Sequence, residues 1–440
     1  SYMPSKLTIT DTEINVTIDR NYAEWNGECM IGGDAKVTYT TNLDYAPLHM
    51  GESAGDDNNS FTLKDNAKLY CLHQNPDQAS NSSVSGLEIF YGDLTLEGNS
   101  YLEAQGRPTN GKYVGYGIVA PGNVFVKDDA EIKTTATGVA LSVVGALEIS
   151  GGTVTAESKG SNGIYAGGAI TITNGAEVKA SGYWPAIFAK GKITIDGSTV
   201  EAKAEADIGI YSKKGDIEIK NSIVKANAAE NYDGIRAGGN VTVEGSWIET
   251  SGDETYGENI KDSVRFNGKD GTVVGNAKLP GDVTVEDGMT LTIPKDASLS
   301  VGQGNKLTNK GGIKRNGVLT KDGGEIICVK HFGNAVWTFD DKTHTKTWDC
   351  CGLVEVQGEE HEMNGGVCAK CGYRVNQSVY PDYDEPTVKP SQTEAPVQNN
   401  PAQDDDLKAP KTGESSLMML YALLLMSGAA AVIAVKKLAK

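Results

Sequence analysis

The stretch GIYAGGAITITNGAEVKASGYWPAIFAKGKITIDGSTVEAKA, residues 163–204, contains the same pattern twice. Residues 163–166 read Gly-Ile-Tyr-Ala, and residues 186–189, 23 positions later, read Ala-Ile-Phe-Ala. Apolar residues at every second position bury one face of a short strand. We therefore take about 23 residues as the unit of an internal repeat.

The repeat extends outward from this stretch in three registers. The first contains segments 117–120, 138–141, 163–166, 186–189, 209–212 and 234–237. The second contains segments 123–126, 146–149, 169–172, 192–195, 216–219 and 240–243, and the third begins at Glu131, Thr153, Glu177, Thr199, Ile223 and Trp247. Each repeat of ~23 residues thus holds three alternating strands, and stacked copies predict an all-β, parallel β-solenoid.

Turn residues support this prediction. Asn174-Gly175, Asp196-Gly197, Asn221 and Gly245 follow the second strand of successive repeats, and these residue types tolerate positive φ. Looser repeats lie at 87–104 and 290–309, so we expect the solenoid to cover 61–320. Residues 1–60 alternate similarly and predict a β cap or small β domain.

The solenoid resembles the right-handed parallel β-helix (pectate-lyase-like) family of polysaccharide lyases, carbohydrate-binding proteins and adhesins. The resemblance covers roughly residues 60–320. It implies right-handed coiling and an extracellular role.

One outward column of the expected solenoid is aromatic. It reads Val119, Ala140, Tyr165, Phe188, Tyr211 and Arg236, and Tyr183 and Trp184 lie in a turn that leads into the same strands. Flat aromatic faces suit the apolar faces of sugar rings. We therefore expect carbohydrate binding at Tyr165, Phe188, Tyr211, Trp184, Tyr183 and Arg236. The alternative is that the stacked aromatics only stabilise the ladder.

The remaining columns favour binding over catalysis. A β-helix lyase is expected to gather calcium ligands with an Arg or Lys base, and a glycosidase needs paired carboxylates. The second-strand column reads Phe125, Glu148, Thr171, Thr194, Glu218 and Thr242; the third-strand column reads Lys133, Thr155, Lys179, Glu201, Lys225 and Glu249. Neither the lyase's calcium ligands with a base nor the glycosidase's pair of carboxylates appears in these columns. Asp207 and Asp233 leave calcium as a candidate ligand. A lyase, a glycoside hydrolase and a protein-binding adhesin remain the alternatives.

The chain has 440 residues and a formal net charge of −18, which argues against a nucleic-acid partner.

Five of its seven cysteines lie between Cys328 and Cys371. This clustering indicates a metal site rather than a disulfide framework. Cys29 and Cys71 could pair, but we interpret them as buried small apolar residues.

Residues 321–375 form a Cys-rich segment. Cys350, His361, Cys368 and Cys371 offer four ligands for a structural zinc ion, with Cys351 or His344 as alternatives for the first. The segment resembles small zinc-ribbon-like modules of clostridial surface proteins. A disulfide at Cys368 is the alternative.

The C-terminal part predicts surface anchoring. Residues 376–409 are rich in Pro and polar residues, which indicates a disordered stalk. In 410–440, Pro410, Thr412 and Gly413 precede an uncharged 19-residue run, 417–435, and a basic tail.

This arrangement resembles the LPxTG-type sorting signal of Gram-positive surface proteins, with Ala409 in place of Leu. The resemblance implies cleavage by sortase after Thr412 and linkage to peptidoglycan. A single-pass membrane anchor is the alternative, and membrane contact is expected only through this segment. The absence of a leader at Ser1 suggests a trimmed or incomplete N-terminus.

Overall fold

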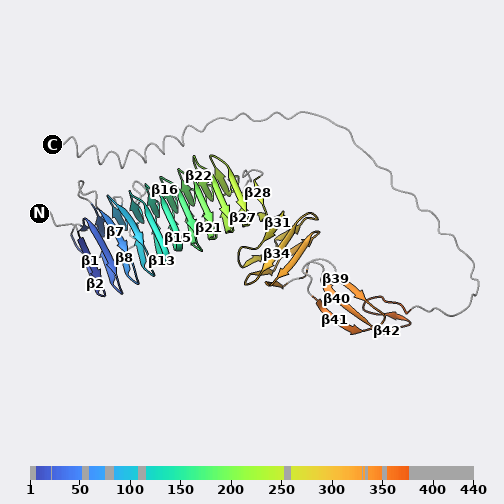
Figure 1. The fold of residues 1–440 in the computed structure, drawn as a ribbon. Coiled ribbons are helices and arrows are strands. Elements are labelled where there is room, and N and C mark those ends of the chain that lie inside the picture. Colours follow the sequence, from blue (N-terminus) through green and yellow to red (C-terminus); the bar gives the residue numbers. More distant parts are fainter. Residues whose placement is uncertain are drawn as a thin grey trace, which may run out of the picture. The chain divides into compact units, whose positions relative to one another are not determined.

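Parallel ladders of short strands run through most of the computed structural model (Figure 1). The structure describes residues 6–20, 22–51, 59–74, 84–107, 115–251, 259–329, 331, 335–348 and 354–375. Within these ranges every regular element is a β-strand, and no helix occurs. The predicted all-β, parallel β-solenoid is confirmed.

Three ladders build the main solenoid, one strand of each per turn. The first contains β1 (Lys6–Thr10), β4 (Glu28–Gly32), β7 (Ser60–Leu63), β10 (Asp93–Leu96), the first parts of β13 (Val124–Ala136) and β15 (Leu147–Ser158), β17 (Ile170–Thr173), β20 (Ile193–Asp196), β23 (Ile217–Lys220), β26 (Val241–Glu244) and β28 (Ile260–Lys261). The second contains β2 (Glu13–Ile18), β5 (Lys36–Thr41), β8 (Lys68–His73), β11 (Tyr101–Gln105), the second parts of β13 and β15, β18 (Glu177–Gly182), β21 (Thr199–Ala204), β24 (Ile223–Asn227), β27 (Trp247–Ser251) and β29 (Ser263–Asn267).

The third ladder is a separate sheet. It contains β3 (Ala23–Trp25), β6 (Leu48–Met50), β9 (Leu87–Ile89), β12 (Ile118–Ala120), β14 (Leu141–Val143), β16 (Ile164–Ala166), β19 (Ile187–Ala189), β22 (Ile210–Ser212) and β25 (Ile235–Ala237). Strands β1, β2 and β3 pair with β4, β5 and β6. Residues 6–50 belong to the segment 1–60 that we expected to be a β cap or small β domain, and their strands stack in the same ladders as the turns that follow.

Alternation places one face of each strand in a continuous core. Ile164, Ile187 and Ile210 are buried on neighbouring turns, and the free thiols of Cys29 and Cys71 are buried in the same core. The interpretation of these cysteines as small apolar residues is confirmed. The predicted turns also have the expected backbone, since φ is 59° at Asn174 and 48° at Asn221.

The strand direction reverses after β29. Its partner β30 (Asp270–Val274) is antiparallel, with Asn267 opposite Asp270. Three further parallel ladders follow: β30 with β33 (Thr290–Ile293) and β36 (Gly312–Arg315); β31 (Asn276–Lys278) with β34 (Ser298–Gly302) and β37 (Val318–Asp322); and β32 (Val283–Val285) with β35 (Lys306–Asn309) and β38 (Glu325–Cys328). These turns have a second buried core and extend past residue 320 to Cys328.

The Cys-rich segment is antiparallel. Strands β39 (Ala335–Phe339), β40 (Thr343–Trp348) and β41 (Val354–Glu360) form one sheet, and β42 (Met363–Asn364) and β43 (Val367–Cys368) form a hairpin. None of the described residues form a helix able to span a membrane. The stalk, the run 417–435 and the sorting residues Pro410, Thr412 and Gly413 lie outside the described residues.

Candidate metal centre and aromatic face

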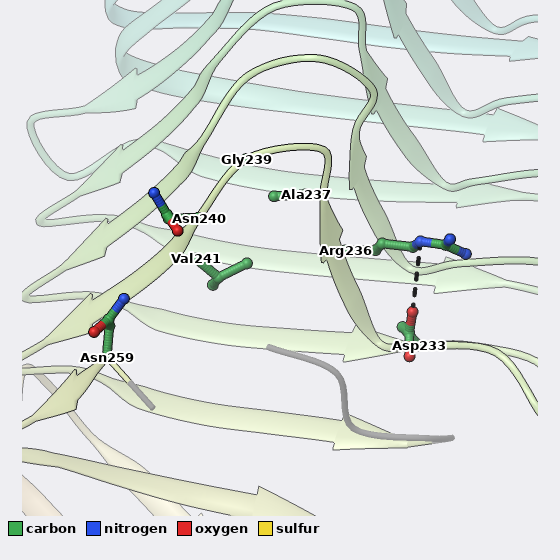
Figure 2. Close-up of a pocket in the computed structure, with 7 residues that line it drawn as sticks. All are labelled: Asp233, Arg236, Ala237, Gly239, Asn240, Val241 and Asn259. Atoms are coloured by element: carbon green, nitrogen blue, oxygen red, sulfur yellow. Dashed lines mark ion pairs between the residues drawn. The ribbon is translucent and has the colours of Figure 1, made fainter. Parts of the chain in front are cut away.

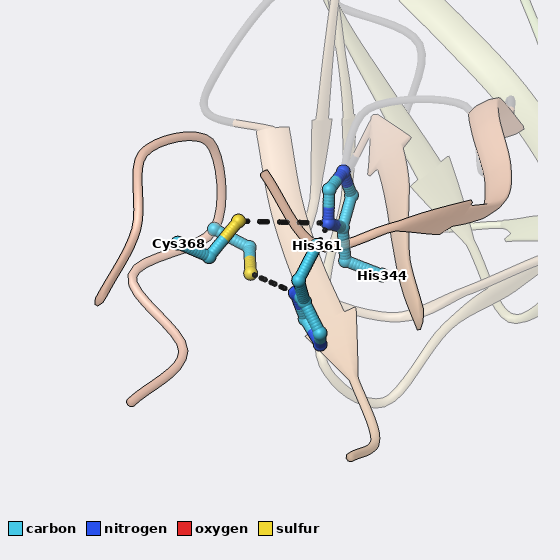
Figure 3. A group of neighbouring side chains, drawn as sticks. His344, His361 and Cys368 are labelled. Carbon is cyan, nitrogen blue, oxygen red and sulfur yellow. Dashed lines mark hydrogen bonds between the residues drawn. The ribbon is translucent and has the colours of Figure 1, made fainter. Parts of the chain in front are cut away.

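Two histidines and two cysteines converge in the Cys-rich segment (Figure 3). One ligand atom from each of His344, His361, Cys368 and Cys371 lies within 4.8 Å of the others. Three of these residues belong to the predicted set, and His344 was an alternative. Cys350 and Cys351 lie outside the described residues.

Local turns bring the ligands together. His344 lies on β40 and His361 directly follows β41, while Cys368 ends β43. The β42–β43 turn needs positive φ at Gly365 and Gly366, 60° and 81°, which glycine adopts without strain. Thus the strands supply the histidines, and the hairpin with its Cys-x-x-Cys turn supplies the thiols.

Hydrogen bonds outside the cluster orient both imidazoles. His361 Nε2 lies 2.8 Å from the backbone oxygen of Asp340, and His344 Nε2 lies 3.1 Å from a carboxylate oxygen of Glu359. A backbone carbonyl only accepts, so His361 donates through Nε2, and the Glu359 carboxylate favours the same tautomer for His344. Both Nδ1 lone pairs therefore face the cluster.

The inner atoms form a donor set that could hold a metal ion. Cys368 Sγ lies 3.7 Å from His344 Nδ1, and Cys371 Sγ lies 3.5 Å from His361 Nδ1. Burial opposes thiolate formation, but backbone N–H groups of Cys371 and Lys370 lower the pKa of Cys368 to about 6. Burial raises the pKa of Cys371. Two imidazoles and two thiols, one readily ionised, fit a tetrahedral metal ion.

The aromatic column lies on the third ladder, whose strands are the first register of the sequence repeat. Tyr165, Phe188 and Tyr211 are register partners on β16, β19 and β22, and Arg236 follows on β25. The Tyr165 and Phe188 rings are stacked with centroids 5.3 Å apart and an interplanar angle of 9°. The Phe188 and Tyr211 rings meet edge to face at 5.4 Å. The column is thus continuous and half-buried.

One position in the predicted column was wrong. Ser142, not Ala140, is the register partner of Tyr165 and Val119. Ala140 is fully buried before β14, and its carbonyl accepts a hydrogen bond from Ile118. The aromatic part of the column therefore begins next to a small polar side chain.

Tyr183 and Trp184 are exposed beside the start of β19. Their rings meet edge to face with centroids 5.9 Å apart, and 44% and 41% of the residues' surface is accessible. Their backbone atoms bond the neighbouring turns at Ala206 and Ser161. Both remain available for contact with a ligand.

Arg236 borders a pocket of about 500 Å³ (Figure 2). Asp233 and Arg236 lie on one side of it and Asn240 and Asn259 on the other. Arg236 Nε lies 3.8 Å from a carboxylate oxygen of Asp233. The Asp233 carboxylate thus has a cationic partner. The Asp207 carboxylate accepts a hydrogen bond from the backbone N–H of Ile208. The one group of possible cation ligands among the described residues is the His–Cys cluster.

Sequence reasoning missed the residues that orient the histidines. Glu359 is one of several carboxylates near the cluster, and Asp340 acts through its backbone carbonyl, which leaves no trace in side-chain chemistry.

No family model, curated protein or solved structure matches this chain.

Proposed function

We propose that the protein is a cell-wall-anchored extracellular β-solenoid, right-handed like the β-helices it resembles, that binds carbohydrate without catalysis. The observation that carries this proposal is the unbroken column Tyr165, Phe188 and Tyr211. These residues are register partners on three consecutive turns, and the centroids of neighbouring rings are 5.3 and 5.4 Å apart. A polysaccharide lying along the solenoid would contact each ring in succession.

The exposed side chains around the column suit a sugar ligand. Tyr hydroxyls provide polar contacts beside apolar ring faces, and Trp184 adds a further exposed ring. Because parallel strands fix the backbone, little conformational entropy is lost on binding. Because the column spans three consecutive turns, the ligand is proposed to be a polymer rather than a single sugar.

A glycan-array screen combined with assays for new reducing ends and for unsaturated products tests this function. Binding without either product supports it. A new reducing end indicates a hydrolase, and an unsaturated product indicates a lyase. Binding of host proteins but of no glycan indicates an adhesin.

In this proposal the cysteine module holds one structural zinc ion. His344, His361, Cys368 and Cys371 would be its four ligands, which leaves no open position for chemistry. The ion would join the β39–β41 sheet to the β42–β43 hairpin. Such a small module needs this link because its own core is small.

Anchoring is proposed through the sorting signal. Sortase would cleave after Thr412 and join the chain to peptidoglycan, with residues 376–409 as the spacer. The test is the Thr412→Ala variant expressed in a Gram-positive host. Loss of the protein from purified peptidoglycan fragments supports sorting, whereas unchanged covalent attachment contradicts it.

A further inference from the structure

The aromatic column ends at a pocket. Among the described residues β25 is the last strand of the third ladder, and Arg236 on this strand is the register partner of Tyr211. The Arg236 guanidinium lies 6.0 Å from the centre of the Tyr211 ring. Arg236 and Ala237 also line the pocket of about 500 Å³ (Figure 2). A polymer that follows the rings along the solenoid therefore meets this pocket directly after the last ring.

The pocket lies where the three ladders end unequally. The first and second ladders continue beyond β25 through β26 to β29, whereas in the described part of the chain no further strand stacks on β25. Val241 belongs to the first core and Ala237 packs against it, and both line the pocket. The missing strand thus leaves apolar side chains of the core as part of the lining.

The rest of the lining is polar and carries no net charge. Asp233 is 7% exposed, and its carboxylate oxygen lies 3.8 Å from Arg236 Nε. Asn240 and Asn259 lie on the opposite side, and both are exposed. One carboxylate, one guanidinium and two amides donate and accept hydrogen bonds. Sugar hydroxyls, which also do both, match this set, and the carboxylate and guanidinium already balance each other.

We propose that this pocket binds the terminal residue of a neutral polysaccharide whose next residues lie on the aromatic column. This inference rests on the proposed carbohydrate-binding function and adds that the glycan is recognised at one chain end. The volume of about 500 Å³ lies within the ~300–1,000 Å³ of small-ligand sites, so a sugar residue fits with its water. A chain that ends here places its terminal hydroxyls against Asp233 and the two amides.

The experiment uses calorimetry to count protein molecules bound per glycan chain and to measure affinity. The probes are three neutral glycans, a β-glucan, a β-mannan and dextran, each as its hexasaccharide and as the long polymer. A site for chain ends binds one protein per chain at either length. A site for internal residues binds many proteins along the long polymer.

A double variant separates the pocket from the column. Asn240→Ala/Asn259→Ala removes both amides, and because these side chains are exposed, the fold should be preserved. The matched control is Asn15→Ala/Asn227→Ala, which removes two amides from outward positions of the second ladder. Neither variant changes an aromatic ring of the column.

We expect at least one of the three glycans to bind, with one protein per chain for both the hexasaccharide and the polymer. For the hexasaccharide, the pocket variant should lose about tenfold or more in affinity and the control less than about twofold.

Many proteins per polymer chain, or equal affinities of the two variants, would overturn recognition of the chain end and leave carbohydrate binding intact. If none of these glycans binds but the glycan array shows another ligand, the neutral end site alone is wrong. If the array is empty as well, both proposals fail.

Discussion

His344 and His361 face each other through their Nδ1 atoms at 3.3 Å. With both Nε2 atoms donating outward, two lone pairs would meet at this distance and repel. A cation between them removes the repulsion and draws in both thiols. The pair therefore indicates how the ligands are oriented before a metal ion binds.

We expect purified protein to carry about one zinc ion per chain, and Cys368→Ser or Cys371→Ser to lose it, because four-ligand zinc sites tolerate little loss. Metal analysis by mass spectrometry is the measurement. Cys328→Ser is the matched control, since this thiol lies outside the cluster. A metal-free protein with a Cys368 disulfide would contradict the prediction.

Glu359 should act as a positioning residue. Glu359→Ala removes the acceptor of His344 Nε2 and frees this ring to rotate, so zinc affinity should fall about tenfold or more in a competition assay with a chromogenic chelator. Glu355→Ala removes a carboxylate that bonds Lys346 and Trp348 instead. Equal affinities in these two variants would show that Glu359 does not orient the ligand.

Stability should depend on His73 below neutral pH. Burial, with a further contribution from Arg107, lowers the pKa of His73 to about 4. The unfolded chain then binds the additional proton between about pH 6.5 and 4, so folding free energy is lost as pH falls through this range. The loss attributable to His73 is up to about 3 kcal/mol.

Urea unfolding of the wild type and His73→Gln at several pH values measures this effect. The difference between the two proteins should change from pH 7 to pH 4, while carboxylates titrate alike in both. A constant difference over that range contradicts the role of His73.

The regular turns could be predicted because two independent patterns agree. Inward Ile residues set the alternation, and Asn or Gly at positive φ sets the turn, as at Asn174 and Asn221. Neither pattern revealed that Ser142, and not Ala140, occupies the outward column, because a displacement by two residues keeps the alternation unchanged. Burial of Ala140 depends on its contact with the neighbouring turn, which only the structure reveals.

The reversal of strand direction between β29 and β30 has a signal in the sequence, but this signal lies in the turn residues and not in the alternation of the strands. Asn267-Gly268 is a strong hairpin dipeptide, and φ at Gly268 is 56°. Strand direction cannot be read from a period of two. At the metal cluster, spacing predicted the thiols and His361, whereas the choice of His344 depends on how β40 pairs with β41.

The central claim is that the aromatic column binds glycan, and the triple variant Tyr165→Ala/Phe188→Ala/Tyr211→Ala tests it most directly. The inward Ile residues stay in place, but two ring contacts are lost, so stability should fall by only a few kcal/mol. The control is Tyr70→Ala/Tyr101→Ala, which removes a ring pair 5.5 Å apart on the second ladder.

The measurement is calorimetric affinity for the best-binding glycan of the array, with the melting temperature recorded alongside. We expect the triple variant to lose at least about 100-fold in affinity, since each stacked ring contributes on the order of 1 kcal/mol, while the control binds like the wild type. Unchanged binding by the folded triple variant would contradict the account and leave the column as ladder packing.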